Sequence, residues 1–138
     1  MLTAQDARAL AELRVDEAVT LLEAGHFSGA YYLSGYAIEL GLKAIIARRF
    51  VADAIPDKQL VLSTYSHDLR ALVTVAQLSN ALNERLALDE DFALFWLIAS
   101  QWSEASRYAI IDEVDATEMV AAVVGLPAGV FTWLKTFY

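Results

Sequence analysis

The 138-residue sequence contains no cysteine, and this absence excludes several kinds of chemistry. A chain without cysteine has no disulfide framework, no thiol nucleophile and no cysteine-based zinc site. Only two histidines are present, His26 and His67, so a histidine-rich metal centre is excluded as well. We therefore predict no metal site and no cofactor, and the composition suits a reducing cytoplasm.

Basic residues are also scarce: the chain has 10 against 18 acidic residues, a formal net charge of −8. A nonspecific grip on nucleic acid depends on clustered lysine and arginine, so this balance argues against it. The charge is uneven, however. Residues 89–118 hold eight acidic residues and one arginine, whereas residues 41–72 hold five basic and three acidic residues. An anion is expected to find its charge partners in residues 41–72.

Long apolar runs are missing too. The longest, residues 119–134, falls short of the roughly 20 residues that span a bilayer, and it contains Gly125, Pro127 and Gly129. The opening MLTAQDARALAEL has acids where a secretory signal has a basic head and an apolar block. We expect a cytoplasmic protein with no membrane association.

What the sequence does contain is apolar residues at helical spacing, with no strand-like alternation. The fold class predicted is all-α, an antiparallel up-and-down bundle of four to five helices forming a single domain over residues 1–138. The pattern predicts a first helix that packs as a hairpin on a second one, a loop over 51–66, and a helix capped by Ser66. Asp115 and Glu118 resemble a capping box that opens a last helix, which Pro127 must kink or split. The long helices are expected over 3–24, 27–50 and 90–108, and a last helix from about 116. A short helix is expected after the Ser66 cap, and a small additional one over 80–87.

The helix over 27–50 contains the run GAYYLSGYAIELGLKA, and it has two different faces. One face carries small residues, whereas the other combines hydroxyl and charged groups. Apolar residues fill the flanks between these faces, so the helix is expected to be central and buried. Glu39 and Lys43 stand four residues apart in the favourable order for an intrahelical ion pair. Two interpretations stay open: a simple ion pair, or a share in a binding site. The polar face comprises Ser28, Tyr32, Gly35, Tyr36, Glu39 and Lys43.

His67 and Arg107 are the other candidate site residues. His67 is expected either to hydrogen-bond beneath a helix start or to carry a proton near neutrality. Arg107 is expected either to bridge acids such as Glu104 or to reach Glu39. A joint hypothesis follows: Tyr32, Tyr36, Glu39 and Lys43 line a groove that His67 and Arg107 complete from neighbouring helices.

Three segments together resemble the HEPN (higher eukaryotes and prokaryotes nucleotide-binding) domain. They are residues 21–44, SHDL at 66–69 and WSEASRY at 102–108, and the resemblance extends over roughly residues 5–137. It implies a helical bundle, usually a homodimer, that often works beside a small nucleotidyltransferase-type protein in a toxin–antitoxin-like pair. Many such domains are metal-independent RNases, in which four to six residues separate an arginine from the histidine that follows it.

The sequence departs from that RNase signature. Counting from Arg107, the three histidine positions hold Asp112, Glu113 and Val114. The function predicted is therefore a binding or regulatory partner in a nucleotidyltransferase-associated, toxin–antitoxin-like system. The expected ligand is a nucleotide or an RNA. Two alternatives stay open: a divergent metal-independent RNase that uses His67 with Arg107 or Lys43, and a purely structural oligomerisation module.

Overall fold

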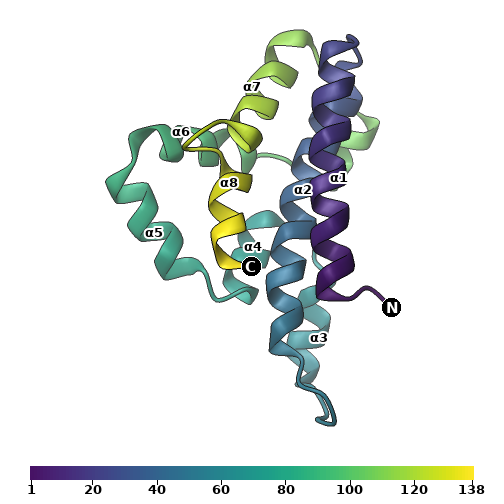
Figure 1. The fold of residues 1–138 in the computed structure, drawn as a ribbon, viewed down its shortest axis with the longest axis vertical. Coiled ribbons are helices and arrows are strands. Elements are labelled where there is room, and N and C mark those ends of the chain that lie inside the picture. The colour runs from purple at the N-terminus through teal and green to yellow at the C-terminus, as the bar shows by residue number, and fades with distance from the viewer.

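A computed structural model describes all residues from 1 to 138, and it contains helices and no strand (Figure 1). The predicted all-α class is confirmed, but the predicted count of four to five helices is too low. Three short 3-10 helices accompany eight α-helices, and no helix is long and apolar enough to cross a membrane. The elements are α1 (Ala4–Glu23), α2 (Phe27–Ile46), η1 (Ala47–Arg49), α3 (Lys58–Thr64), α4 (Leu69–Val75), α5 (Ser79–Leu88), α6 (Glu90–Ala99), η2 (Glu104–Tyr108), α7 (Glu113–Val124), α8 (Val130–Leu134) and η3 (Lys135–Phe137).

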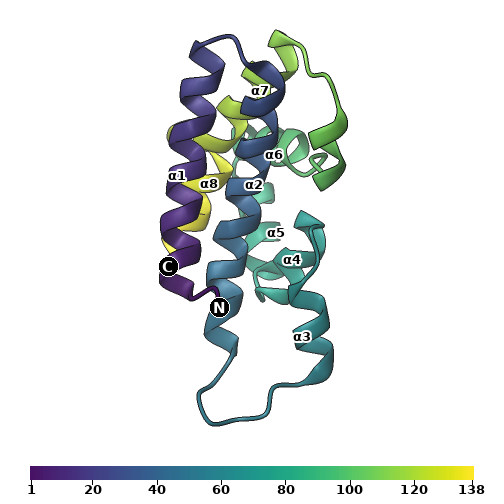
Figure 2. The ribbon, with the colours of Figure 1, turned by 90° about the vertical axis from the view of Figure 1, so that its right-hand side faces the viewer.

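The first two helices form the predicted antiparallel hairpin, and Figures 1 and 2 both show them side by side. α1 begins at a capping box in which Thr3 and Asp6 exchange side-chain and backbone hydrogen bonds. The turn after α1 uses Gly25 at a φ of 81°, a conformation that glycine adopts without strain. Small residues on both helices are fully buried, which lets the two backbones approach closely: Ala7, Ala11 and Ala18 on α1, and Ala30 and Ala37 on α2.

α2 is the central helix of the molecule, as its apolar flanks predict. It packs against α1, α4, α7, α8 and η2, and Ile38, Leu42 and Ile46 are completely buried. Phe92 from α6 and Leu134 from α8 belong to the same core. Any polar side chain on this part of α2 must therefore find its partners inside the protein.

Two predictions between α2 and α4 are wrong. The predicted loop 51–66 contains α3, which Asp57 caps by accepting a hydrogen bond from the Leu60 amide. Asp68, not Ser66, caps α4, because its carboxylate accepts from the amides of Arg70 and Ala71. The Ser66 hydroxyl instead accepts from the Asp68 amide, one step before the helix.

The predicted helix over 90–108 is broken. α6 ends at Ala99, and the chain turns before η2. The turn allows the Trp102 ring to pack against Gly35 of α2, where Trp102 is 3% exposed. The last helix also begins earlier than predicted: Asp112 is its cap, and Asp115 lies in the first turn. The predicted split near Pro127 is confirmed, since α7 ends at Val124 and α8 begins at Val130.

One prediction concerns Tyr138, whose ring packs on the core and under the Arg8 guanidinium, 5.6 Å away. Burial, helped by the nearby Glu12, raises the pKa of the Tyr138 hydroxyl to about 12. In the unfolded chain a tyrosine ionises near pH 10, so the unfolded state loses its proton first as the pH rises. The free energy of unfolding should therefore fall between about pH 10 and about pH 12.

Denaturant unfolding from pH 9 to pH 12 measures this loss. Tyr138→Phe should flatten the fall, because the titrating hydroxyl is gone, whereas Tyr65→Phe, at an exposed ring, should leave the curve unchanged. The same steep fall in Tyr138→Phe as in the wild type would contradict the assignment.

Candidate functional site

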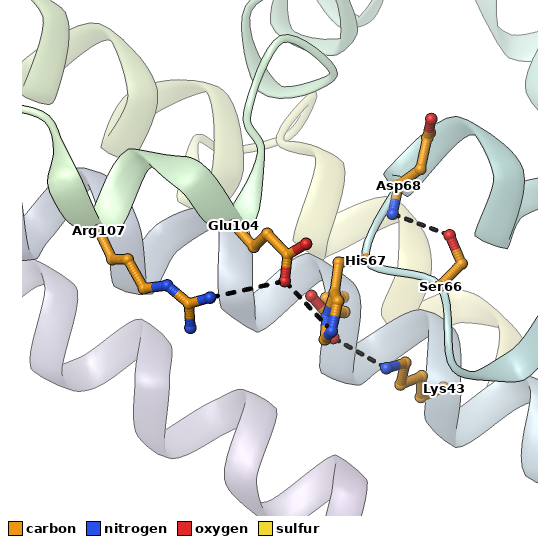
Figure 3. A network of polar contacts seen from close by, with 7 residues as sticks. Lys43, Ser66, His67, Asp68, Glu104 and Arg107 are labelled. Carbon is orange, nitrogen blue, oxygen red and sulfur yellow. Dashed lines mark hydrogen bonds and ion pairs between the residues drawn. The ribbon is translucent and has the colours of Figure 1, made fainter.

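Glu39 lies at the centre of a polar cluster in the core-facing part of α2. Only 2% of the residue is exposed. Its Oε1 atom accepts a hydrogen bond from Lys43 Nζ at 2.9 Å and lies 2.9 Å from His67 Nδ1 (Figure 3). The predicted intrahelical ion pair is confirmed, but it is not isolated, because His67 from another segment shares the same oxygen. Glu39 Oε2 is buried and has no hydrogen-bond partner.

His67 lies in the short connection before α4, and its neighbours fix that connection. Asp68 caps α4, and the Ser66 hydroxyl accepts from the Asp68 amide, so residues 66–68 are held against the helix start. The imidazole is half-exposed, and its second nitrogen, Nε2, lies 3.2 Å from Glu104 Oε2. A neutral imidazole carries one N–H, so only the protonated ring can donate to both carboxylates.

η2 contributes Glu104 and Arg107 to the cluster. Arg107 Nη2 lies 3.9 Å from Glu104 Oε2, and the guanidinium also lies over the Tyr108 ring at 5.2 Å. Of the two contacts predicted for Arg107, the structure has the one with Glu104. Arg107 makes no hydrogen bond or ion pair with Glu39 and is linked to it only through Glu104 and His67. Figure 3 shows Glu104 between Arg107 and His67.

Tyr32 and Tyr36 pack by their rings and not by their hydroxyls. Their ring centroids are 6.0 Å apart and stacked, and Tyr32 lies 5.9 Å from the Trp102 ring. Neither hydroxyl bonds to a member of the polar cluster, so the predicted groove has an aromatic part that is separate from its charged part. Gly35, on the same helix, makes room for the Trp102 ring.

A hollow of about 350 Å³ lies beside His67, and several of its residues were not predicted from the sequence. Arg70 Nη2 donates to the Ser100 hydroxyl at 3.2 Å, which joins the start of α4 to the end of α6. Glu104 has a sequence signal, since it stands three residues before Arg107 in WSEASRY. Arg70 and the serines have none, because their contacts depend on how α4 and α6 dock. The lining is Ser66, His67, Asp68, Arg70, Ser100, Trp102, Ser103 and Glu104.

The cluster carries charges of both signs, and this defines what it can do. Lys43, His67 and Arg107 provide donors, whereas Glu39 and Glu104 provide acceptors, so a ligand or protein surface with mixed polarity finds partners here. No group of three or more histidine, aspartate or glutamate side chains is arranged to hold a metal ion. The half-exposed imidazole beside a buried carboxylate can also hold or move a proton.

The fold and the site define a helical bundle with a buried glutamate that anchors a surface histidine. Comparison with family models, with curated proteins and with solved structures finds no match to this chain.

A prediction concerns the residue that holds His67 in place. Asp68→Ala removes the α4 cap, which should lower the free energy of unfolding by about 1 kcal/mol. It should also loosen the 66–68 connection, so the His67 ring signals should move in the NMR spectrum. Asp57→Ala removes the equivalent cap of α3 and serves as the control, since it should cost stability without moving the His67 signals. Equal shifts of His67 in both variants would contradict this placement.

Proposed function

We propose that this protein is a HEPN-like binding module that acts as a homodimeric regulatory partner of a nucleotidyltransferase-type protein in a toxin–antitoxin-like pair. One observation carries the proposal: the three segments that support the resemblance meet at one imidazole. Residues 21–44 supply Glu39, residues 66–69 supply His67 and residues 102–108 supply Glu104, and both ring nitrogens lie within 3.2 Å of a carboxylate oxygen.

The electrostatics of the cluster favour partner binding over the handling of phosphate. Lys43 already pairs with Glu39, and Arg107 lies beside Glu104. Arg70 in the hollow beside His67 has no ion pair, but Asp68 and Glu104 line the same hollow, so an approaching phosphate would meet two carboxylates there. Phosphate binding needs lysine and arginine that carboxylates do not already neutralise. A protein surface that offers both donors and acceptors fits the cluster better, since specific interfaces match charges of both signs.

Co-expression with the products of adjacent genes tests the proposal. A nucleotidyltransferase-type protein should co-purify with the tagged wild-type chain and with His26→Ala, which changes an exposed histidine at the α1–α2 turn. His67→Ala should reduce the recovery at least tenfold. The absence of such a protein among the adjacent genes, or equal recovery with His67→Ala, would contradict the proposal.

Direct nucleotide binding is tested separately by thermal unfolding with ATP, GTP and AMP. A ligand that binds only the folded state raises the melting temperature, and the rise grows with the ratio of the free ligand concentration to its Kd. A rise in the wild type that His67→Ala abolishes would place the nucleotide at this cluster. No rise with any of the three nucleotides rejects direct binding and leaves the partner protein as the ligand of the module.

A second candidate function is a divergent metal-independent RNase, and the contact between Glu39 and His67 favours it. A buried carboxylate on Nδ1 orients an imidazole, which then takes the 2′-hydroxyl proton while Lys43 or Arg107 stabilises the phosphorane. Incubation of the purified chain with total RNA decides between the candidates. Cleavage by the wild type but not by His67→Ala supports the RNase, whereas cleavage by both, or by neither, rejects it.

A further inference from the structure

A second concave surface lies between the start of α1, the end of α2 and the end of α3. Its volume is about 600 Å³, within the roughly 300–1,000 Å³ typical of small-molecule sites. Six of its nine lining residues are hydrophobic, and Lys43 is the only one with a charged side chain. His67, Glu104 and Arg107 do not line it, so Lys43 alone connects this pocket to the polar cluster.

The Lys43 ammonium can still bind an anion. It carries three N–H groups, and its one hydrogen bond is to Glu39 Oε1 at 2.9 Å. The side chain is 16% exposed, so a ligand inside the pocket can reach it. The two threonine hydroxyls of the lining already donate elsewhere, Thr64 to the Leu60 carbonyl oxygen and Thr3 to Asp6 Oδ2. Lys43 is the one cationic side chain that the lining offers to a ligand.

The pocket walls expose apolar surface to water. Leu2 is 49% exposed, Phe50 37% and Tyr65 74%, and all three line the same pocket. Covering such surface with an apolar group is favourable in proportion to the area removed from water. One cation at a largely apolar wall fits a ligand with one negative charge and an apolar body. A polyanion finds no second cationic side chain here.

We propose that this pocket binds a small amphipathic carboxylate. The carboxylate accepts from the two remaining Lys43 N–H groups, and the apolar body covers Leu2, Phe50 and Tyr65. The site is separate from the proposed function, because none of the pocket residues except Lys43 belongs to the cluster around His67. Such a ligand would compete with Glu39 for the Lys43 ammonium.

NMR titration with sodium octanoate tests the proposal, with octyltrimethylammonium and 1-octanol as probes of equal chain length and different head group. Octanoate should shift the amide signals of Ala4, Ala47 and Tyr65 to saturation, at least tenfold more tightly than the other two. Equal affinity for the three head groups, no saturation, or shifts elsewhere on the protein would overturn the proposal.

Variants separate the pocket from the rest of the molecule. Lys43→Met should weaken octanoate binding at least tenfold, whereas Lys58→Met, at an exposed lysine of α3, should not change it. Ala47→Leu places a larger side chain in the pocket and leaves Lys43 and Glu39 in place, so it should also weaken octanoate binding. This variant tests the proposal even if Lys43→Met fails to fold. His67→Ala should bind octanoate normally even where it loses the partner protein. Unchanged binding in Ala47→Leu overturns the proposal.

Discussion

Gly35→Ala should lower the free energy of unfolding by about 3 kcal/mol, the upper end of the usual cost of overfilling a core. A Cβ atom at position 35 would overlap the Trp102 ring at Cγ, Cδ1 and Cδ2. The ring cannot move aside easily, because it is 3% exposed and lies against Tyr32. Urea unfolding followed by circular dichroism measures the loss.

Gly41→Ala is the matched control on the same helix. The nearest atom to its added Cβ is Leu134 Cδ1 at 3.4 Å, an ordinary contact, and alanine favours the helix by up to about 1 kcal/mol over glycine. This variant should be as stable as the wild type or more so. Similar losses at Gly35 and Gly41 would show that helix α2 disfavours any added methyl group and would remove the special role of Trp102.

Glu39→Ala should have the second large effect, a loss of about 3 kcal/mol. Removing one partner of a buried ion pair leaves the other charge without compensation, and here the Lys43 ammonium and the His67 ring both lose their acceptor. The partial exposure of these two side chains keeps the loss at the lower end of the usual 3–5 kcal/mol. Glu84→Ala, at an exposed glutamate of α5 without an ion pair, should stay within about 0.5 kcal/mol.

The double variant Glu39→Met with Lys43→Met tells a structural pair from a site. Replacing both partners of a buried ion pair by apolar residues of similar size is often neutral or stabilising. We expect a stable double variant that no longer binds its partner protein. A double variant that is stable and binds its partner protein normally would show that Glu39 and Lys43 form a simple ion pair with no share in a binding site.

Features that depend on neighbours within one helix were predictable from the sequence. The pair of Glu39 and Lys43 needs only a spacing of four residues, and the central position of α2 follows from its apolar flanks. The hairpin of α1 and α2 follows from Gly25 between two amphipathic segments. These predictions succeeded because local geometry alone determines them.

Features that depend on tertiary docking were not predictable in the same way. Nothing in the local pattern of residues 90–108 shows that Trp102 must leave the helix to reach Gly35, 67 positions earlier in the chain. Asp68 and Ser66 stand only two positions apart and both side chain types can cap a helix, so the sequence pattern does not decide between them. Arg70 joins the hollow only because α4 lies beside the end of α6.

The site itself was predicted as a set of residues but not as a set of contacts. His67 reaches Glu39 across 28 positions of sequence. Glu104, which was predicted only as a partner for Arg107, also lies beside His67. The tyrosines share the predicted face of α2, yet their rings stack on each other, and Tyr32 also lies against Trp102. Aromatic pairs of this kind add stability beyond the area they bury, and this ring packing is not visible in the spacing alone.

The central claim is that Glu39 anchors His67, and NMR of the imidazole nitrogens tests it most directly. Because an ionised carboxylate only accepts hydrogen bonds, His67 Nδ1 must carry a proton when it lies 2.9 Å from Glu39 Oε1. The long-range proton–nitrogen spectrum at pH 7 should show Nδ1 of His67 protonated in the wild type, and this state should be lost in Glu39→Met while the exposed His26 stays unchanged. An unprotonated Nδ1 at His67, or a spectrum of His67 that Glu39→Met leaves unaltered, would contradict the account.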